Sequence, residues 1–242
     1  MSVTKYAGPI ALAFVMVVSL AERTEAQVAA RVSTTEAGPL AKDIDPVTRY
    51  RLPLATRADM RDDAERKIFD DMTKGGQPPL RLLSPKFAKP MSEARRYLKY
   101  DTGIDNRLIE ITVLVTARGL NHQFEWTQWE AHGSHAPGAG KPELEQPIID
   151  IIKYCKPVTG LAPKDAVLIK YGRELFGPNK KVSSETFAEA LRLFGKRGVV
   201  DLTAMMAQYT ATAMEVNAYD TRLDEGQKLL LPPLKDTPLC PQ

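Results

Sequence analysis

The sequence contains very little cysteine: Cys155 and Cys240 are the only two among 242 residues. They form neither a C-x-x-C pair nor the ligand spacing of a zinc knuckle, which excludes a redox motif or a structural metal site built on cysteine. A disulfide between them and two unrelated thiols both remain open, and a disulfide would require an oxidising compartment.

A large excess of charge of one sign is also lacking. The formal net charge is +3, and basic residues alternate with acidic ones instead of forming a stripe. We therefore expect no nucleic-acid partner, because nucleic-acid binding depends on a concentrated basic surface. Beyond residue 26 the sequence has no apolar stretch long enough to span a bilayer, so we expect no stable membrane insertion after signal removal.

One apolar run does occur, at the N-terminus. Lys5 precedes the apolar segment 7–20, which is shorter than a comfortable membrane span and has the form of a signal-peptide core. Two pairs of small residues, ending at Ala21 and Ala26, match signal cleavage sites. We predict a secretory signal peptide at 1–26, with an uncleaved anchor as the alternative, and a mature protein that is secreted or periplasmic.

The rest of the chain divides into three parts. Residues 27–56 contain scattered prolines and no sustained period, which predicts an extended N-terminal arm. Residues 57–223 show helical periodicity throughout. Residues 224–242 lose this periodicity, which predicts an irregular C-terminal tail. The sequence thus predicts one helical domain between an arm and a tail.

Several helices are expected within the domain. Their predicted ranges are 57–74, from Pro90 to about 100, 105–120, 121–133, 142–154, 163–176, 183–194 and 198–219. Met60, Ala64, Ile68 and Met72 form an apolar line along the first helix, and Gly195 closes the helix at 183–194. The run ITVLVT would also suit a strand, but charged residues at helical spacing favour a helix and no partner strand is visible. The predicted fold class is all-α.

All three histidines and both tryptophans fall within the segment NHQFEWTQWEAHGSHA, residues 121–136. On a helix, Glu125, Trp129 and His132 occupy positions i, i+4 and i+7 and therefore share one side. A helix C-terminus and a carboxylate within reach both favour a cationic imidazole. His132 is therefore a candidate for proton transfer, with Glu125 as its partner.

A metal site is the natural rival for the same segment. Its ligands would be His132, His135 and Glu125, but the spacings E-x-x-H and H-E-x-x-H are absent and His135 follows the predicted helix end. We therefore expect neither a metal ion nor an organic cofactor.

Two blocks of sequence carry a family resemblance: RLIEITVLVTARGLNHQFEW and VSSETFAEALRLFGKRGVVDLTAMMAQYTATAMEVNAY. Together they resemble the carboxymuconolactone decarboxylase family, which is related to the alkylhydroperoxidase D fold. The resemblance covers residues 52–223. It implies an all-α, alkylhydroperoxidase D-like domain that forms homo-oligomers, with a pocket near the motif helix.

The chain departs from both motifs of this family. Where the thiol peroxidase branch has C-x-x-C-x-x-x-H, this sequence has Glu125, Gln128 and His132. A thiol mechanism is therefore excluded at these positions, because it needs an attacking and a resolving cysteine. The decarboxylase motif E-W-x-x-H is matched by Glu125 and Trp126, with Trp129 in place of the histidine.

The resemblance, taken with these residues, implies a cofactor-independent lyase or isomerase, a carboxy-lyase of the carboxymuconolactone decarboxylase type, acting on a small unsaturated carboxylic acid or lactone. The predicted catalytic residues are His132 and Glu125. The predicted substrate-binding residues, of which the two arginines would hold an anion, are Trp126, Trp129, Arg107 and Arg118. The alternatives are a peroxiredoxin-like relative without the catalytic cysteine pair and an oligomeric scaffold that binds without turnover.

Overall fold

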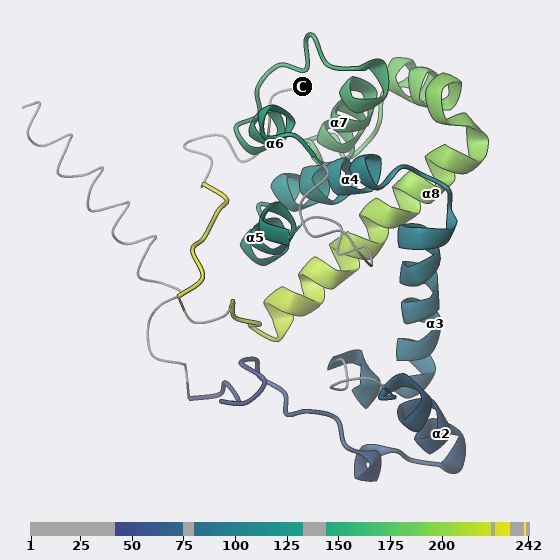
Figure 1. Cartoon of the computed structure of the whole chain (residues 1–242), viewed down its shortest axis with the longest axis vertical. Helices are drawn as coiled ribbons and strands as arrows, with labels where there is room; N and C mark the ends of the chain where they lie inside the picture. The colour runs from purple at the N-terminus through teal and green to yellow at the C-terminus, as the bar shows by residue number, and fades with distance from the viewer. Residues whose placement is uncertain (1–41, 75–79, 133–143, 224–225, 233–239, 241–242) are drawn as a thin grey trace, which may run out of the picture.

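The computed structural model describes residues 42–74, 80–132, 144–223, 226–232 and 240 (Figure 1). These residues form helices and contain no strand, which confirms the all-α prediction. The elements are η1 (Arg57–Asp59), α2 (Asp63–Met72), η2 (Leu80–Leu83), α3 (Pro85–Arg96), η3 (Tyr97–Asp101), α4 (Asn106–Gly119), α5 (Gln123–His132), α6 (Gln146–Lys153), α7 (Pro163–Phe176) and α8 (Ser184–Ala218). The predicted signal peptide at 1–26 and most of the predicted tail lie outside the described residues.

Helix α4 is the centre of the domain and packs against α5, α6, α7 and α8 (Figure 1). Asp105 caps it by accepting the backbone N–H of Arg107 at 2.8 Å. The hydroxyls of Thr112 and Thr116 donate to the carbonyls four residues earlier, each at 2.7 Å. These bonds satisfy the polar groups of the run ITVLVT, so that this β-branched sequence is buried as a helix.

Helix α7 lies very close to α4 because glycine stands at the contact. A Cβ atom added at Gly172 would meet Cγ1 of Val115 at 2.6 Å, well inside van der Waals contact. A Cβ atom added at Gly119, at the end of α4, would likewise lie 2.6 Å from Cβ of Phe176 at the end of α7. The two helices therefore need a residue without a side chain at both positions.

The longest helix, α8, bends sharply at Gly195, whose φ of 67° and ψ of 173° interrupt the helical geometry. The sequence predicted a helix end at this glycine, and the structure places the kink there. Beyond the kink, Met205 and Met206 are buried in the main core, whereas Met214 is 69% exposed. The second half of α8 crosses the domain diagonally beneath α4 in Figure 1.

Helices α2 and α3 pack together beside this core, with α2 lying across the lower end of α3 in Figure 1. The prediction of a helix from residue 57 was wrong in its start, because Asp62 caps α2 by accepting the backbone N–H of Glu65 at 2.8 Å. The predicted apolar line is also broken, since Ala64 is exposed and Met60 is buried ahead of the helix. A small second cluster joins α2 and α3 to η2 and the arm; it contains Ala55, Leu82, Ala88, Phe69 and Met72.

The predicted helix start near Pro90 was also wrong. Helix α3 begins at Pro85, where a missing N–H is harmless, and Pro90 lies inside the helix. An internal proline removes one backbone hydrogen bond without ending the helix here. The helix continues directly into η3, a π-helical turn of 5 residues, and such turns re-aim the side chains that follow.

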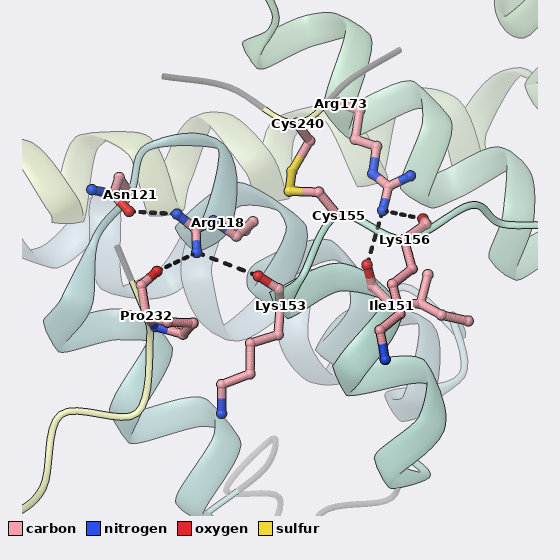
Figure 2. The surroundings of a disulfide bond; sticks show 9 residues. All are labelled: Arg118, Asn121, Ile151, Lys153, Cys155, Lys156, Arg173, Pro232 and Cys240. Carbon is pink, nitrogen blue, oxygen red and sulfur yellow. Dashed lines mark hydrogen bonds between the residues drawn. A yellow bond between two sulfur atoms is a disulfide. The ribbon is translucent and has the colours of Figure 1, made fainter. Parts of the chain in front are cut away.

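The C-terminal segment is tied to the domain by a disulfide between Cys155 and Cys240, with Cα atoms 5.1 Å apart (Figure 2). The structure therefore decides between the two alternatives that the sequence left open. Residues 226–232 contact α5, where the backbone N–H of Leu230 donates to the hydroxyl of Thr127 at 3.2 Å. The arm is held at the opposite end of the domain, where the N–H of Arg51 donates to the Tyr219 carbonyl at 2.9 Å.

Candidate functional site

His122 anchors the start of the motif helix α5. Its Nδ1 atom accepts the backbone N–H of Glu125 at 3.2 Å, so the imidazole caps the helix. Burial lowers the pKa of His122, while contacts with Ala213 and Asn217 of α8 oppose this shift. A neutral ring that accepts at Nδ1 carries its proton at Nε2, the nitrogen available to α8. His122 therefore positions α5 against α8.

The two tryptophans of α5 have different surroundings. Trp126 is fully buried, and its indole N–H donates to Glu130 at 2.5 Å. Glu130 in turn forms a partly buried ion pair with Lys153 of α6, with a shortest N to O distance of 2.8 Å. The side of α5 that carries Trp126 therefore packs against α6 through polar as well as apolar groups. For this reason the sequence of α5 shows no clear apolar face.

Trp129 lies on the side of α5 that faces α8 and η3. Its ring meets Tyr209 edge to face, with centroids 5.4 Å apart and planes at 83°. The ammonium group of Lys99 lies 5.1 Å from the Trp129 ring centroid, and the guanidinium of Arg95 lies 5.6 Å from that of Tyr209. Two cations therefore cover two buried aromatic rings at this face.

Glu125 lies among these groups and is 7% exposed. Burial raises the pKa of its carboxyl group, and this is the largest influence. Attraction to Arg95, Arg81 and Lys99 and a hydrogen bond from Trp129 offset part of the rise. A carboxyl group with a raised pKa holds its proton more readily near neutrality, which is the property required of a general acid.

We call this set the charge cluster: Arg81, Arg95, Lys99, Glu125, Trp129 and Tyr209. Its cations come from three successive elements, η2, α3 and η3. Lys99 is 8% exposed, and burial together with the charge of Arg95 lowers its pKa to about 8. The Tyr209 hydroxyl is buried and makes no hydrogen bond of good geometry among the described residues, although Arg95 lies beside it. The cluster therefore contains an unused hydroxyl between helices α3, α5 and α8.

Glu125 and Trp129 are the only predicted site residues that the structure brings into the charge cluster within its described part. Helix α5 extends to His132. The side chain of His132, and the whole of His135, lie outside the described residues. Of the three residues predicted to share one side of the helix, Glu125 and Trp129 do so in the described part of the structure.

The two predicted anion-holding arginines lie elsewhere. Arg107 forms a bidentate ion pair with Asp165 of α7, both bonds being 2.7 Å, and a third bond to Glu145 at 3.0 Å. These partners hold the pKa of Arg107 above its ordinary value. The guanidinium of Arg107 is therefore used to join α4 to α6 and α7.

Arg118 is buried beside the disulfide (Figure 2). It donates to the carbonyl of Pro232 at 2.8 Å and to the side chain of Asn121 at 2.5 Å. Burial lowers its pKa to about 10. Arg118 thus supports the C-terminal segment at the end of α4, and its hydrogen bonds to Lys153, Pro232 and Asn121 lie outside the charge cluster.

Sequence reasoning missed Arg95, Lys99, Arg81 and Tyr209. The only local signal was the spacing of four between Arg95 and Lys99 in ARRYLKY. That spacing is equally typical of a solvated helix face, and the adjacent Arg96 is in fact exposed. The residues become recognisable as a set only when η3 is packed against α5 and α8.

Within the described ranges, no group of three or more His, Cys, Asp or Glu side chains is placed to hold a metal ion. No helix in that part of the chain is long and apolar enough to cross a membrane. Comparison with models of known protein families and with curated proteins finds no match to this chain. The charge cluster is therefore the feature on which a functional assignment depends.

Proposed function

We propose that this protein is a cofactor-independent lyase or isomerase, similar to carboxymuconolactone decarboxylases, that acts on a small unsaturated carboxylic acid or lactone. The observation that carries the proposal is Glu125: a buried carboxyl group with a raised pKa, surrounded by Arg95, Arg81 and Lys99. A burial this costly is typical of a group used in chemistry.

The proposed reaction needs one proton donor and no redox partner. When the bond to a substrate carboxylate breaks, carbon dioxide leaves and its electron pair delocalises into the adjacent unsaturated carbonyl. Protonated Glu125 then delivers its proton to carbon and becomes a carboxylate, which solvent reprotonates. In an isomerase, the same group removes a proton and returns it at another carbon. His132, two turns further along α5, is proposed as a second proton carrier.

The cations of the cluster complement this chemistry. As negative charge develops on the substrate carbonyl, Arg95 and Lys99 stabilise it in a site with little water. The rings of Trp129 and Tyr209 present apolar surface to the unsaturated part of the substrate. The residues therefore combine a proton donor, positive charge and an apolar surface.

Assembly and export are part of the proposal. We propose an alkylhydroperoxidase D-like homo-oligomer; the exposed Val200 and Met214 of α8, at 65% and 69%, support an interface on this helix. Secretion or periplasmic localisation is supported by the disulfide between Cys155 and Cys240. Sedimentation of the mature protein tests the first point, and its intact mass from the native host tests the second.

The function is tested by a substrate screen. Wild-type protein and the variants Glu125→Gln and His132→Ala are assayed on small unsaturated lactone acids and keto acids. Glu125→Gln should lower kcat by roughly 10²- to 10⁴-fold, as expected for loss of a general acid. Glu93→Gln, which alters an exposed carboxylate of α3, is the matched control and should retain full activity.

Four results would count against the proposal. Full turnover in Glu125→Gln would remove Glu125 from the reaction, and full turnover in His132→Ala would do the same for His132. Loss of activity on adding a chelator would contradict a cofactor-independent reaction. Failure of the wild-type protein to convert any of the compounds would favour a binding scaffold.

A further inference from the structure

The cations of the charge cluster are not equally neutralised. Arg81 forms an ion pair with Glu215 of α8, with an N to O distance of 2.6 Å. Neither Arg95 nor Lys99 forms such a pair with a carboxylate of the described residues. Both are instead placed over aromatic rings, Arg95 over Tyr209 and Lys99 over Trp129.

The charge balance of the cluster is therefore positive. Once Arg81 is paired, Glu125 is the one carboxylate of the cluster set against Arg95 and Lys99. Protonation of Glu125 leaves both cations without an opposing charge. The proximity of Arg95 and Lys99 is itself unfavourable, since each raises the cost of charging the other. Buried positive charge of this kind is stabilised when an anion binds beside it.

A hydroxyl group at the same place provides a directional contact. Tyr209 is 2% exposed, and its hydroxyl makes no hydrogen bond of good geometry within the described ranges. The Arg95 guanidinium beside it is itself a donor, so the phenol O–H is left without an acceptor there. Burial raises the pKa of Tyr209, so the phenol remains protonated and able to donate. A buried donor left unsatisfied costs free energy, and a ligand oxygen would remove this cost.

We infer that Arg95, Lys99 and Tyr209 form a subsite that binds the carboxylate of a small organic acid. Trp129 and the ring of Tyr209 provide the apolar contact that distinguishes an organic anion from inorganic phosphate. Arg95 is partly exposed, so a ligand would approach the subsite from the surface at Arg95, whereas Lys99 and Tyr209 are buried behind it. The inference rests on the proposed function in identifying this acid as the substrate.

The subsite also has an expected pH dependence. Lys99 loses its charge near pH 8, so affinity for the carboxylate should fall as the pH rises from 7 to 9. The other charged or titratable groups facing Lys99 across the cluster are Arg81 of η2, Arg95 of α3, Tyr100 of η3, Glu125 of α5, and Tyr209 and Glu215 of α8. Ionisation of Glu125, whose pKa is raised by burial, would weaken anion binding in the same direction, so the part of the pH dependence that is lost in Lys99→Met is the part that reports on Lys99.

Crotonate, a small unsaturated monocarboxylate, is a suitable probe. It is titrated into the full, disulfide-intact protein while tryptophan fluorescence is recorded, because Trp129 adjoins the subsite. Saturable quenching is expected, with affinity roughly tenfold weaker in Arg95→Gln and in Lys99→Met. Tyr209→Phe should weaken binding by roughly threefold to tenfold. Arg96→Gln and Lys89→Met change exposed neighbours and should bind as the wild type does.

Ligand controls define the chemistry. Crotonamide keeps the shape of crotonate without its charge and should not bind, and inorganic phosphate should not displace crotonate. No saturable quenching in the wild type, unchanged affinity in both Arg95→Gln and Lys99→Met, or equal binding of crotonamide or phosphate would each overturn the subsite. Loss of the pH dependence in Lys99→Met, with the helical circular dichroism retained, would separate a binding role from misfolding.

The two proposals can fail separately. Crotonate binding that depends on Arg95 and Lys99, without turnover of any substrate, keeps the subsite and removes the lyase. Turnover with a KM unchanged in both variants removes the subsite and keeps the lyase.

Discussion

The ammonium group of Lys99 lies 5.1 Å from the centre of the Trp129 indole ring, so a side chain from η3 meets one from α5 in a buried cation–π contact. Burial and the neighbouring Arg95 lower the pKa of this lysine to about 8 from an ordinary value of 10.5. The stability of the fold should therefore depend on pH through Lys99 between about pH 8 and pH 10.5.

The sign of this coupling is testable. Between pH 8 and 10.5 the unfolded chain holds a proton on Lys99 that the folded chain has released, so rising pH favours folding. The free energy of unfolding of the wild type should rise relative to Lys99→Met by roughly 1 to 3 kcal/mol across this range. Urea unfolding at pH 7.5 and 10.5 measures it, with Lys89→Met as the exposed control. A difference that stays constant with pH would contradict the prediction.

Glu125 should make the folded protein less stable as the pH rises, whereas a well-paired carboxylate would make it more stable. Its raised pKa means that the folded chain binds a proton more tightly than the unfolded chain does. The stability of the wild type relative to Glu125→Gln should therefore decrease as pH rises from 4.5 towards the raised pKa. Thermal unfolding of both proteins at pH 4.5, 6 and 7.5 follows this change. An increase in relative stability over the same steps would show that Glu125 is ionised and well paired.

Removal of the disulfide should destabilise the fold. Cys155 and Cys240 are 85 residues apart in the sequence, so their bond restricts a large loop of the unfolded chain. Replacing both with serine should lower the free energy of unfolding by roughly 2 to 4 kcal/mol, measured by urea unfolding. Reduction of the wild type should reproduce the loss, and an unchanged midpoint would contradict the prediction. Any peroxide consumption should be the same in the double variant.

Arg107 should contribute to stability and not to substrate affinity. Substitution by glutamine leaves the buried carboxylate of Asp165 without its bidentate partner, at a cost of roughly 2 to 4 kcal/mol. Adding Asp165→Asn should recover part of this loss, because the orphaned charge is then removed. Denaturation of the two single variants and the double variant measures the coupling. Weaker crotonate binding in folded Arg107→Gln would return this arginine to the site.

The close contact of α4 and α7 makes Gly172 sensitive to any side chain. Gly172→Ala would place a methyl group against Val115, at a distance that requires the helices to separate. We expect a loss of roughly 1 to 3 kcal/mol in the free energy of unfolding, despite the higher helix propensity of alanine. The double variant with Val115→Ala should be less affected than the sum of its parts. Additive losses would show that the contact is not the cause.

Much of the helical architecture could be predicted from the sequence. The bounds of α7, the cap of α4 at Asp105, the kink of α8 at Gly195 and the helical state of the motif segment all depend on residues within a few positions of one another. Local backbone preferences and apolar spacing are sufficient for such features. The errors concern where a helix begins: α2 starts after Asp62, α3 at Pro85, and the helix predicted from residue 142 at Gln146. A single capping side chain or proline decides such a start.

The candidate site could be predicted only in part. Glu125 and Trp129 were evident because they stand four residues apart on one helix. Arg95, Lys99 and Tyr209 join them from α3, η3 and α8. Within each of these elements, no spacing of residues in the sequence marks the side chain as part of a site. Whether such cations meet a buried carboxylate depends on how the helices pack, and sequence periodicity carries no information on that.

The use of Arg107, Arg118 and the two cysteines was likewise decided by tertiary structure. Each is a residue type compatible with several roles, and its role depends on the partner that the fold brings within bonding distance. Asp165 is 58 residues from Arg107, Pro232 is 114 residues from Arg118, and Cys240 is 85 residues from Cys155. The sequence determined which helices form and which groups are able to react or bind. The packing of those helices decided which groups meet, because contacts between distant residues depend on the geometry of the whole core.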